Sequence, residues 1–335
     1  MPKLSVIVPV YNVQAYVAEC LNSLLNQTYE DYEVVVVDDG STDLSGMIAE
    51  DYCMRDERYR VIHKENGGLM SAWVRGVNES RGEYIGFVDS DDFVNVRSFE
   101  ILMETALGFD ADIVTCNYER IDESTSMFSE VNLVANQVKV YADNEIDVVR
   151  EMALPYPGGK SFSMARWNKV FRRNVLVSNL IYCECLSRTF EDRYIVPACL
   201  YSADRVCVID ASLFYYRDRA GSNSGMYKPN LLEEILRMYD VQKRVLEDKG
   251  LFEQFGANWE LAFLDYIRLY VSRNIVGAKD FNAKLSSCQI LLANNVACDR
   301  MERFGKRLDG KQGFALRLSF RIKSALLLAL SSYCA

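Results

Sequence analysis

The sequence predicts an α/β fold, with a mostly parallel sheet flanked by helices and a helical extension at the C-terminal end. Over the first part of the chain, short apolar runs alternate with segments whose apolar residues recur at helical spacing. This alternation is typical of a parallel sheet covered by helices. A polar, turn-forming cluster follows each of the first four predicted strands. Because such sheets bind ligands beyond the carboxyl ends of their strands, these clusters are candidates for a binding site.

The first predicted strand is Leu4–Val10, an apolar run as expected of a strand buried on both faces. Asn12 can cap the helix that follows, because an Asn side chain accepts from the free N–H groups at a helix start. The apolar positions of this helix follow i, i+3, i+4, i+7, i+8 and i+11 and are Val13, Tyr16, Val17, Cys20, Leu21 and Leu24. Further strands are predicted at residues 33–38, 59–63, 84–88 and 112–116, and helices at 44–52, 69–78 and 97–107.

After about residue 227, helical periodicity takes over, at residues 231–246, 259–272 and 281–292. We therefore predict a first domain at residues 1–227 and a helical C-terminal region at 228–335. Its last part, residues 303–335, is a basic amphipathic tail, in which residues 303–323 contain seven Lys or Arg and one Asp. A basic helix with an apolar face is typical of a segment lying on an anionic membrane. A docking helix with a solvated basic face would have the same pattern.

The composition argues against several classes of function. A net charge of −9 disfavours binding along a nucleic-acid backbone. The ten cysteines are scattered without a Cys-x-x-Cys pair, which indicates buried thiols in a reducing compartment rather than a zinc site or disulfide framework. The single histidine, His63, restricts any Ser-His-Asp or Cys-His site to that residue. A nucleotide-dependent oxidoreductase is disfavoured because no Gly-x-Gly-x-x-Gly follows the first strand.

The polar cluster behind the fourth predicted strand carries the strongest chemical signal. Asp89, Ser90, Asp91 and Asp92 directly follow apolar residues, and three carboxylates this close repel one another unless a cation lies among them. Hard oxygen ligands favour Mg²⁺ or Mn²⁺, which usually bind substrate phosphates. Each earlier cluster, at residues 9–12, 38–43 and 66–68, could be an ordinary turn or helix cap if it stood alone. All four are predicted at one edge of the sheet.

Taken in order, these motifs resemble glycosyltransferase family 2, whose members have the GT-A fold. The resemblance covers roughly residues 3–225, and the matching segments are SVIVPVYN at 5–12, VDDGSTD at 37–43, NGG at 66–68, GEYIGFVDSDD at 82–92, WNKVF at 167–171, FED at 190–192 and YYRDRAGS at 215–222. The last segment fits the family's bacterial polysaccharide branch. The resemblance implies a GT-A catalytic domain at residues 1–227 and sugar transfer from a UDP-sugar donor with inversion at the anomeric carbon.

The resemblance also implies which residues bind the donor. Pro9, Tyr11 and Asp39 would hold the nucleotide base, with Asp39 accepting from the uracil ring nitrogen and Tyr11 stacking on the ring. Further donor-binding candidates in the matching motifs are Asn12, Ser41, Asn66, Gly67, Asp89 and Ser90.

The resemblance assigns the remaining chemistry to carboxylates. Asp91 would be the main ligand of a divalent cation, Mn²⁺ or Mg²⁺, with Asp89 beside it, and the cation would bridge to the donor diphosphate. Asp192 would be the general base that takes the proton of the acceptor hydroxyl, and Glu191 would help to orient it. Without the surrounding motifs, the acidic pair at 191–192 would be read as a solvated surface pair.

One part of the chain departs from the family pattern. Members often carry Ala-Arg-Asn-x-Gly in the helix after Asn-Gly-Gly, whereas Trp73 and Val74 stand here in place of the arginine and asparagine. Arg75 lies two positions after Trp73, about 200° around a helix, so it cannot take the same place. Arg217 and Arg219 are candidates for the missing positive charge near the diphosphate, although surface ion pairs would explain them equally well.

The predicted function is that of a metal-dependent hexosyltransferase that adds a sugar to a saccharide acceptor, lipid-linked in our hypothesis, in cell-surface polysaccharide synthesis. The alternative is a turnover-deficient sugar- or nucleotide-binding or scaffold protein of the same fold. Residues 1–3 lead directly into a predicted strand, so no signal peptide is expected, and no apolar stretch has the ~18 residues of a membrane-spanning helix. The predicted location is cytoplasmic, with the basic tail as a candidate contact to the inner face of the plasma membrane.

Overall fold

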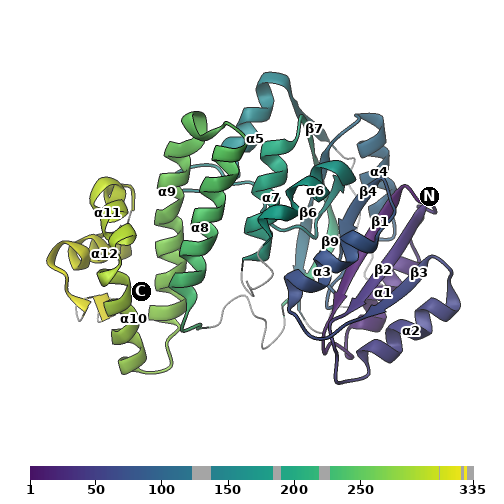
Figure 1. Ribbon diagram of the computed structural model, residues 1–335, viewed down its shortest axis with the longest axis horizontal. Coiled ribbons are helices and arrows are strands. Elements are labelled where there is room, and N and C mark those ends of the chain that lie inside the picture. Colours follow the sequence, from purple (N-terminus) through teal and green to yellow (C-terminus); the bar gives the residue numbers. More distant parts are fainter. Residues whose placement is uncertain (123–136, 184–189, 219–226, 309, 326–327, 330–335) are drawn as a thin grey trace. The chain divides into compact units, whose positions relative to one another are not determined.

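The computed structural model describes residues 1–122, 137–183, 190–218, 227–308, 310–325 and 328–329 (Figure 1). The chain forms two compact units. The first comprises Met1–Val149 and Met164–Ala220, and the second comprises Arg150–Ser163 and Gly221–Ala335. The strands described in the structure all lie in the first unit, whereas the second is helical.

The first unit is built on a nine-stranded sheet within the described residues. Its strands are β1 (Leu4–Val10), β2 (Tyr32–Asp38), β3 (Tyr59–His63), β4 (Tyr84–Phe87), β5 (Phe93–Val94), β6 (Ile113–Ile121), β7 (Val138–Ala142), β8 (Lys169–Arg172) and β9 (Arg205–Arg217). They are ordered β3-β2-β1-β4-β8-β6-β9-β5, and β7 pairs with β9. The half formed by β1 to β4 is parallel, as predicted, and β6 and β9 are parallel to each other. β5, β7 and β8 run antiparallel to their neighbours, so the sheet as a whole is mixed.

The strand order determines which loops meet at the edge of the sheet. Every residue of β1 and β2 is buried, because strands in the middle of a covered sheet have apolar side chains on both faces. β1, β2 and β4 end at the same edge, since they are parallel. β8 is antiparallel to both β4 and β6, with Gly86 opposite Val170. The chain that enters β8 therefore starts at the edge where β4 ends.

Helices connect and cover these strands. In the first unit they are α1 (Val17–Leu25), α2 (Ser45–Arg55), α3 (Leu69–Glu79), α4 (Ser98–Gly108), the 3₁₀ turn Asp143–Glu145, the start of α5 (Ile146–Met152), α6 (Arg173–Asn179), the 3₁₀ turn Leu180–Tyr182 and α7 (Glu191–Ser202). Among them, α3 packs on β1 and β2, and α2 packs on β3. α1 begins at Val17, so the predicted cap at Asn12 is wrong. Asn12 has a φ of +50°, and its side-chain oxygen accepts from Thr42 instead.

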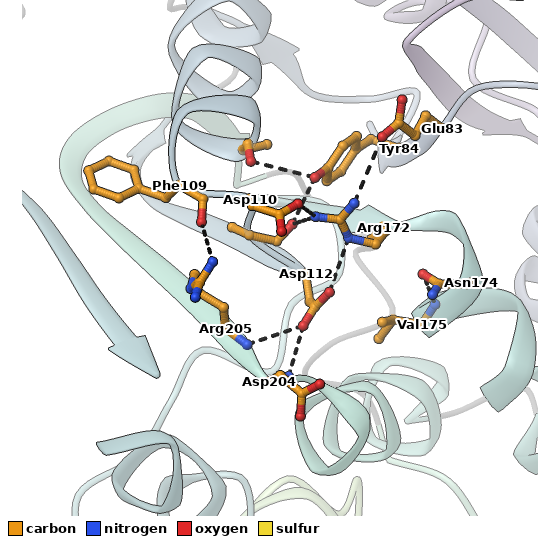
Figure 2. A network of polar contacts seen from close by, with 12 residues as sticks. Glu83, Tyr84, Phe109, Asp110, Asp112, Arg172, Asn174, Val175, Asp204 and Arg205 are labelled. Carbon is orange, nitrogen blue, oxygen red and sulfur yellow. Dashed lines mark hydrogen bonds and ion pairs between the residues drawn. The ribbon is translucent and has the colours of Figure 1, made fainter. Parts of the chain in front are cut away.

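An ion-pair network fixes the opposite edge of the sheet, where β8 ends and β9 begins (Figure 2). Arg172 donates to Asp112 Oδ1 over 3.1 Å and to Asp110 Oδ1 over 2.5 Å. The other oxygen of Asp112 accepts from the backbone N–H groups of Asp204 and Arg205, over 2.8 and 3.1 Å. Arg172 and Asp112 thus join the end of β8 to the starts of β6 and β9. This edge of the sheet is opposite the one where the polar clusters lie.

The second unit is helical, as predicted for this part of the chain. It contains α8 (Leu231–Asp248), α9 (Phe252–Tyr270), the π-helix Val271–Val276, α10 (Phe281–Ala293), α11 (Asn295–Phe304), the 3₁₀ turn Gly305–Arg307 and α12 (Gly310–Ile322). Tyr239 and Trp259 stack in its core with ring centroids 4.0 Å apart, and the Trp259 Nε1–H donates to the Tyr239 carbonyl over 2.8 Å. None of the helices in the described residues is long and apolar enough to cross a membrane.

Candidate active site

The loops that follow β1 and β2 are bonded to each other at the carboxyl edge of the sheet. The backbone N–H of Asn12 donates to Ser41 Oγ over 3.2 Å, and Asn12 Oδ1 accepts from the backbone N–H of Thr42 over 2.8 Å. The backbone N–H of Asp39 donates to the Val10 carbonyl over 2.9 Å. The structure therefore brings the candidate donor-binding residues after these two strands together.

The carboxylate of Asp39 holds the Asn-Gly-Gly loop that follows β3. Its Oδ1 accepts from the backbone N–H of Gly67 over 2.9 Å, and its Oδ2 accepts from Gly68 over 2.7 Å. Gly68 has a φ of +89°, a conformation that favours glycine. The Lys64 ammonium, which the sequence did not single out, also contacts Oδ1, over 2.5 Å. A carboxylate offers about four acceptor positions, so about one remains unfilled on Asp39, whose side chain is 3% exposed.

An exposed aromatic side chain, that of Tyr11, directly follows β1. Tyr11 is 49% exposed, whereas Pro9 is buried within β1. Gly40, with a φ of +74°, allows its loop to approach Asn66, since a Cβ there would lie 2.9 Å from the Asn66 backbone nitrogen. An open tyrosine ring can stack on a planar ligand ring.

The acidic loop after β4, residues 89–92, is held in place by contacts with Arg217 at the end of β9. Asp92 is buried, and its Oδ1 accepts from the backbone N–H of Arg217 over 2.8 Å. The Arg217 guanidinium donates to the Asp91 carbonyl over 3.1 Å and to Glu19 Oε2 over 2.7 Å. Arg217, a predicted diphosphate ligand, is thus bonded to the acidic loop and to α1. The other predicted arginine, Arg219, lies outside the described residues.

Crowding and burial make two carboxylates of the acidic loop, Asp89 and Asp92, costly to ionise. Burial raises the pKa of Asp89 to about 7; Arg166 opposes this rise, and the charges of Asp91 and Asp192 reinforce it. Burial, reinforced by the charges of Asp91 and Asp89, also raises the pKa of Asp92. A bound divalent cation would favour the ionised forms. The electrostatics of the loop therefore suit a cation site.

The donor set of the acidic loop fits Mg²⁺ or Mn²⁺. Asp89 and Asp91 offer hard carboxylate oxygens of the kind that these cations prefer. In the part of the chain that the structure describes, no group of three or more His, Cys, Asp or Glu side chains is arranged to hold a metal ion. Among the described residues, Asp89 and Asp91 would hold the cation, and donor phosphates and water would complete its coordination, as is usual for Mg²⁺.

Arg166, which the sequence pattern did not indicate, joins the acidic loop to the start of α7. Its Nη2 donates to Asp89 Oδ1 over 2.6 Å, and its Nη1 donates to Asp192 Oδ1 over 2.7 Å. Glu191 Oε1 lies 3.8 Å from Nη1. Glu191 and Asp192 are both in the first turn of α7, where the helix dipole favours negative charge. The predicted metal ligand Asp89 and the predicted base Asp192 therefore lie in one site.

Two residues, Trp73 and Val74, depart from the expected motif of this helix, and Trp73 lies beside Arg166 in the structure. Trp73 is buried, and its ring centroid lies 5.9 Å from the central carbon of the Arg166 guanidinium. The indole also meets the Phe87 ring edge-on, at 5.7 Å between centroids. Val74 is partly exposed, and the exposed Arg75 pairs with an acidic residue one helical turn later. The positive charge next to Asp89 and Asp192 therefore comes from Arg166, which precedes β8, rather than from a residue of α3.

A buried lysine interacts electrostatically with Asp192, one of the two acids that Arg166 contacts. Lys169 Nζ donates to the Ala165 carbonyl over 2.6 Å and to Asn168 Oδ1 over 2.7 Å. Burial lowers the pKa of Lys169 to about 7, and the charge of Asp192 opposes this shift. Lys169 and Arg166 flank the Trp-Asn part of the WNKVF motif, so proximity to this motif is the sequence signal that could have pointed to Arg166.

Comparison with known proteins identifies relatives over most of the chain. Residues 5–176 match the sequence profile described as glycosyl transferase family 2. The uncharacterized glycosyltransferase EpsJ of Bacillus subtilis is 36% identical over 253 residues, which cover 75% of this chain and 72% of that protein. The putative glycosyltransferase EpsH of Bacillus subtilis is 31% identical over 256 residues, covering 76% and 72%. The crystal structure of S. aureus TarS 1-349 in complex with UDP-GlcNAc has a TM-score of 0.68 at 21% identity, covering 99% of this chain and 90% of that one.

Proposed function

This chain belongs to glycosyl transferase family 2, and on that basis we propose that it moves a sugar from a UDP-sugar to a saccharide acceptor, with inversion, in cell-surface polysaccharide synthesis. A uridine diphosphate donor is supported by the complex of S. aureus TarS, a protein of similar fold, with UDP-GlcNAc. The observation that carries the proposal is the guanidinium of Arg166, which contacts Asp89 of the acidic loop and Asp192 of α7 at once.

We assign recognition of the base to the loops after β1, β2 and β3. Tyr11 stacks on the uracil, beside Pro9, and the acceptor position that remains on Asp39 takes the single ring N–H of uracil. Lys64, bonded to the same carboxylate, is suited to donate to an adjacent uracil carbonyl. Other donor contacts are assigned to Asn12, Ser41, Asn66, Gly67 and Ser90. Cytosine lacks this ring N–H, so the site should prefer UDP to CDP.

We assign the leaving diphosphate to the acidic loop. Asp91 and Asp89 would hold Mg²⁺ or Mn²⁺, which when bound supplies positive charge to neutralise the departing diphosphate. Arg219 remains a candidate diphosphate contact. Arg217 contributes at least by fixing the Asp91 carbonyl and the Asp92 carboxylate, which preserves the shape of the loop.

Asp192 is assigned as the general base. The acceptor hydroxyl oxygen attacks the anomeric carbon from the face opposite the diphosphate, and its proton passes to the Asp192 carboxylate. The bond between the anomeric carbon and the diphosphate oxygen breaks, and UDP leaves with the electron pair, so the configuration inverts. A positioned base of this kind typically contributes about 10²–10⁴-fold to the rate. Glu191, one residue earlier in the first turn of α7, adds negative charge beside the base.

The experiment that tests this function uses the full chain and a panel of UDP-sugars with MnCl₂. Thermal unfolding in the presence of each donor reports binding, because a ligand that binds only the folded state raises the melting temperature. Release of UDP reports turnover, with CDP-sugars as the control. A protein that is stabilised by no UDP-sugar and releases no UDP would refute the donor assignment.

The alternative, a protein of this fold without turnover, rests on Trp73, which occupies a position where many members carry arginine. Such a protein would bind UDP-sugars without hydrolysing them, so the release assay separates the two functions. We favour the enzyme because a protein that only binds donors does not need Asp192 held in contact with a buried arginine.

We propose that the acceptor is lipid-linked and that the basic tail contacts the membrane. Within α12 the Phe314 side chain is 62% exposed, as a residue that inserts into an interface would be. Arg303 in α11 instead forms two 2.8 Å hydrogen bonds with Glu260 and is engaged within its own unit. Deleting residues 303–335 should shift the protein from the membrane fraction to the soluble fraction while UDP binding remains. Unchanged partitioning would refute the membrane contact.

A further inference from the structure

We propose that Arg166 is a positioning residue that fixes the spacing between the donor-side carboxylate Asp89 and the acceptor-side base Asp192; this inference rests on the proposed function. One guanidinium donates to Asp89 Oδ1 over 2.6 Å and to Asp192 Oδ1 over 2.7 Å, through different nitrogens. A guanidinium is planar and presents its donors in a rigid fork. The two carboxylates therefore cannot separate or rotate without breaking a charge-assisted hydrogen bond.

The guanidinium itself is held in place by its surroundings. The Arg166 side chain is 1% exposed, and its central carbon lies 5.9 Å from the ring centroid of Trp73 and 5.6 Å from that of Phe87. These rings come from α3 and β4, and they contact each other edge-on. Aromatic rings from two elements thus restrict the movement of the arginine that contacts both acids.

The backbone behind Arg166 is equally fixed. Two residues later, Asn168 Nδ2 donates to the Cys116 carbonyl over 2.7 Å, and the Asn168 carbonyl accepts from Cys116 N–H over 3.2 Å. Asn168 is followed directly by β8, which is hydrogen-bonded to β4 on one side and β6 on the other. The hydrogen bonds of the sheet therefore fix the position of the Arg166 guanidinium. The guanidinium in turn fixes the position of Asp192 relative to the acidic loop after β4.

A purely structural role, in which any buried cation would neutralise the acids, makes a different prediction. Lysine would supply the charge from a single nitrogen, but it cannot reproduce two bonds in a planar fork. The Arg166 Nε is also buried without a hydrogen-bond partner among the described residues. An unsatisfied buried donor is destabilising, so this arrangement orients the two acids at the expense of stability.

The test compares Arg166→Lys with Arg172→Lys. Arg172 also bridges carboxylates, at the opposite edge of the sheet (Figure 2), so it controls for the general cost of replacing a bridging arginine. We expect Arg166→Lys to lower kcat for hydrolysis of the UDP-sugar that the wild type turns over by about 10²-fold, as a misplaced reacting group does. The Kd for UDP with MnCl₂ should change far less. Arg172→Lys should retain the wild-type kcat even if its melting temperature falls.

A wild-type kcat in Arg166→Lys, or an equal loss in Arg172→Lys, would overturn the positioning role. If Arg166→Lys does not fold by circular dichroism, Trp73→Phe takes its place, because it loosens the cover of the guanidinium and leaves every charge in place. A reduced kcat with unchanged UDP affinity in Trp73→Phe supports the proposal, and an unchanged kcat overturns it. A wild type that neither binds UDP nor hydrolyses any UDP-sugar would instead refute the proposed function, which makes the two failures distinguishable.

Discussion

Replacing Asp192 with asparagine tests the assignment of the base with little change in structure. The amide oxygen of asparagine can still accept from Arg166 Nη1, which donates to Asp192 Oδ1 over 2.7 Å, so the side chain should stay in place. The substitution removes the basic oxygen that would take the acceptor proton. We expect transfer to slow by about 10²–10⁴-fold, which corresponds to ~2.7–5.4 kcal/mol in the activation barrier at ~1.36 kcal/mol per tenfold.

The same substitution should cost little stability. It replaces a hydrogen bond between two charged groups with one in which only the Arg166 guanidinium is charged, and a hydrogen bond to a charged group still contributes about 1.5–3 kcal/mol. The Asp192 side chain is 23% exposed, and removing its charge relieves repulsion from Asp89 and Glu191. A net loss of about 1 kcal/mol would lower the melting temperature by roughly 2–4 °C for a domain of this size. Activity and stability should thus respond very differently.

The assay is UDP release from the donor that the wild type turns over, measured beside UDP affinity and thermal unfolding. Glu191→Gln is the matched control, because Glu191 lies next to Asp192 but 3.8 Å from the guanidinium. It should lose much less turnover than Asp192→Asn. If Asp192→Asn keeps turnover within a few-fold of the wild type, Asp192 is not the base and the proposed proton path is wrong.

Two further predictions concern stability. Gly76→Ala should destabilise the fold by up to about 2 kcal/mol in denaturant unfolding, because a Cβ would lie 2.4 Å from Ile7 Cγ2 and overpacking costs about 1–3 kcal/mol against a gain of about 1 kcal/mol in helix propensity. Gly108→Ala, which meets nothing within 4 Å, should not destabilise. A hydrogen bond to Asp38 raises the pKa of His63 above its ordinary value of 6.5, so its contribution to stability is present below pH 6.5 and is lost as the pH rises through the folded-state pKa. The melting temperature of the wild type should therefore fall more steeply over that range than that of His63→Gln, and parallel curves would refute this.

The sequence was sufficient to predict the parallel half of the sheet and the placement of its polar loops. β1 and β2 are long apolar runs buried on both faces, so their type does not depend on distant partners. The antiparallel position of β8 between β4 and β6 is different, because it joins segments that are far apart in the chain. No local pattern encodes such a pairing, and for the same reason the position of Arg166 was not predicted.

In the site, as in the sheet, the sequence indicated features that depend on neighbouring residues but not those that depend on contacts between distant segments. Asp89 and Asp91 directly follow their predicted strand, so a local motif was enough to single them out as candidates. The groups that hold Asp89, Asp192 and Asp39, namely Arg166 and Lys64, come from loops whose approach depends on tertiary structure. Trp73 was noted as a departure, but its contact with Arg166 could be recognised only after the chain entering β8 had been located.

The most direct test of the central claim is a calorimetric titration of UDP into the wild type and Asp91→Ala, each with and without MnCl₂. We predict that Mn²⁺ strengthens UDP binding to the wild type and that this metal-dependent gain disappears in Asp91→Ala. Full metal-dependent affinity in Asp91→Ala would contradict the assignment of the acidic loop as the place where the donor diphosphate is held.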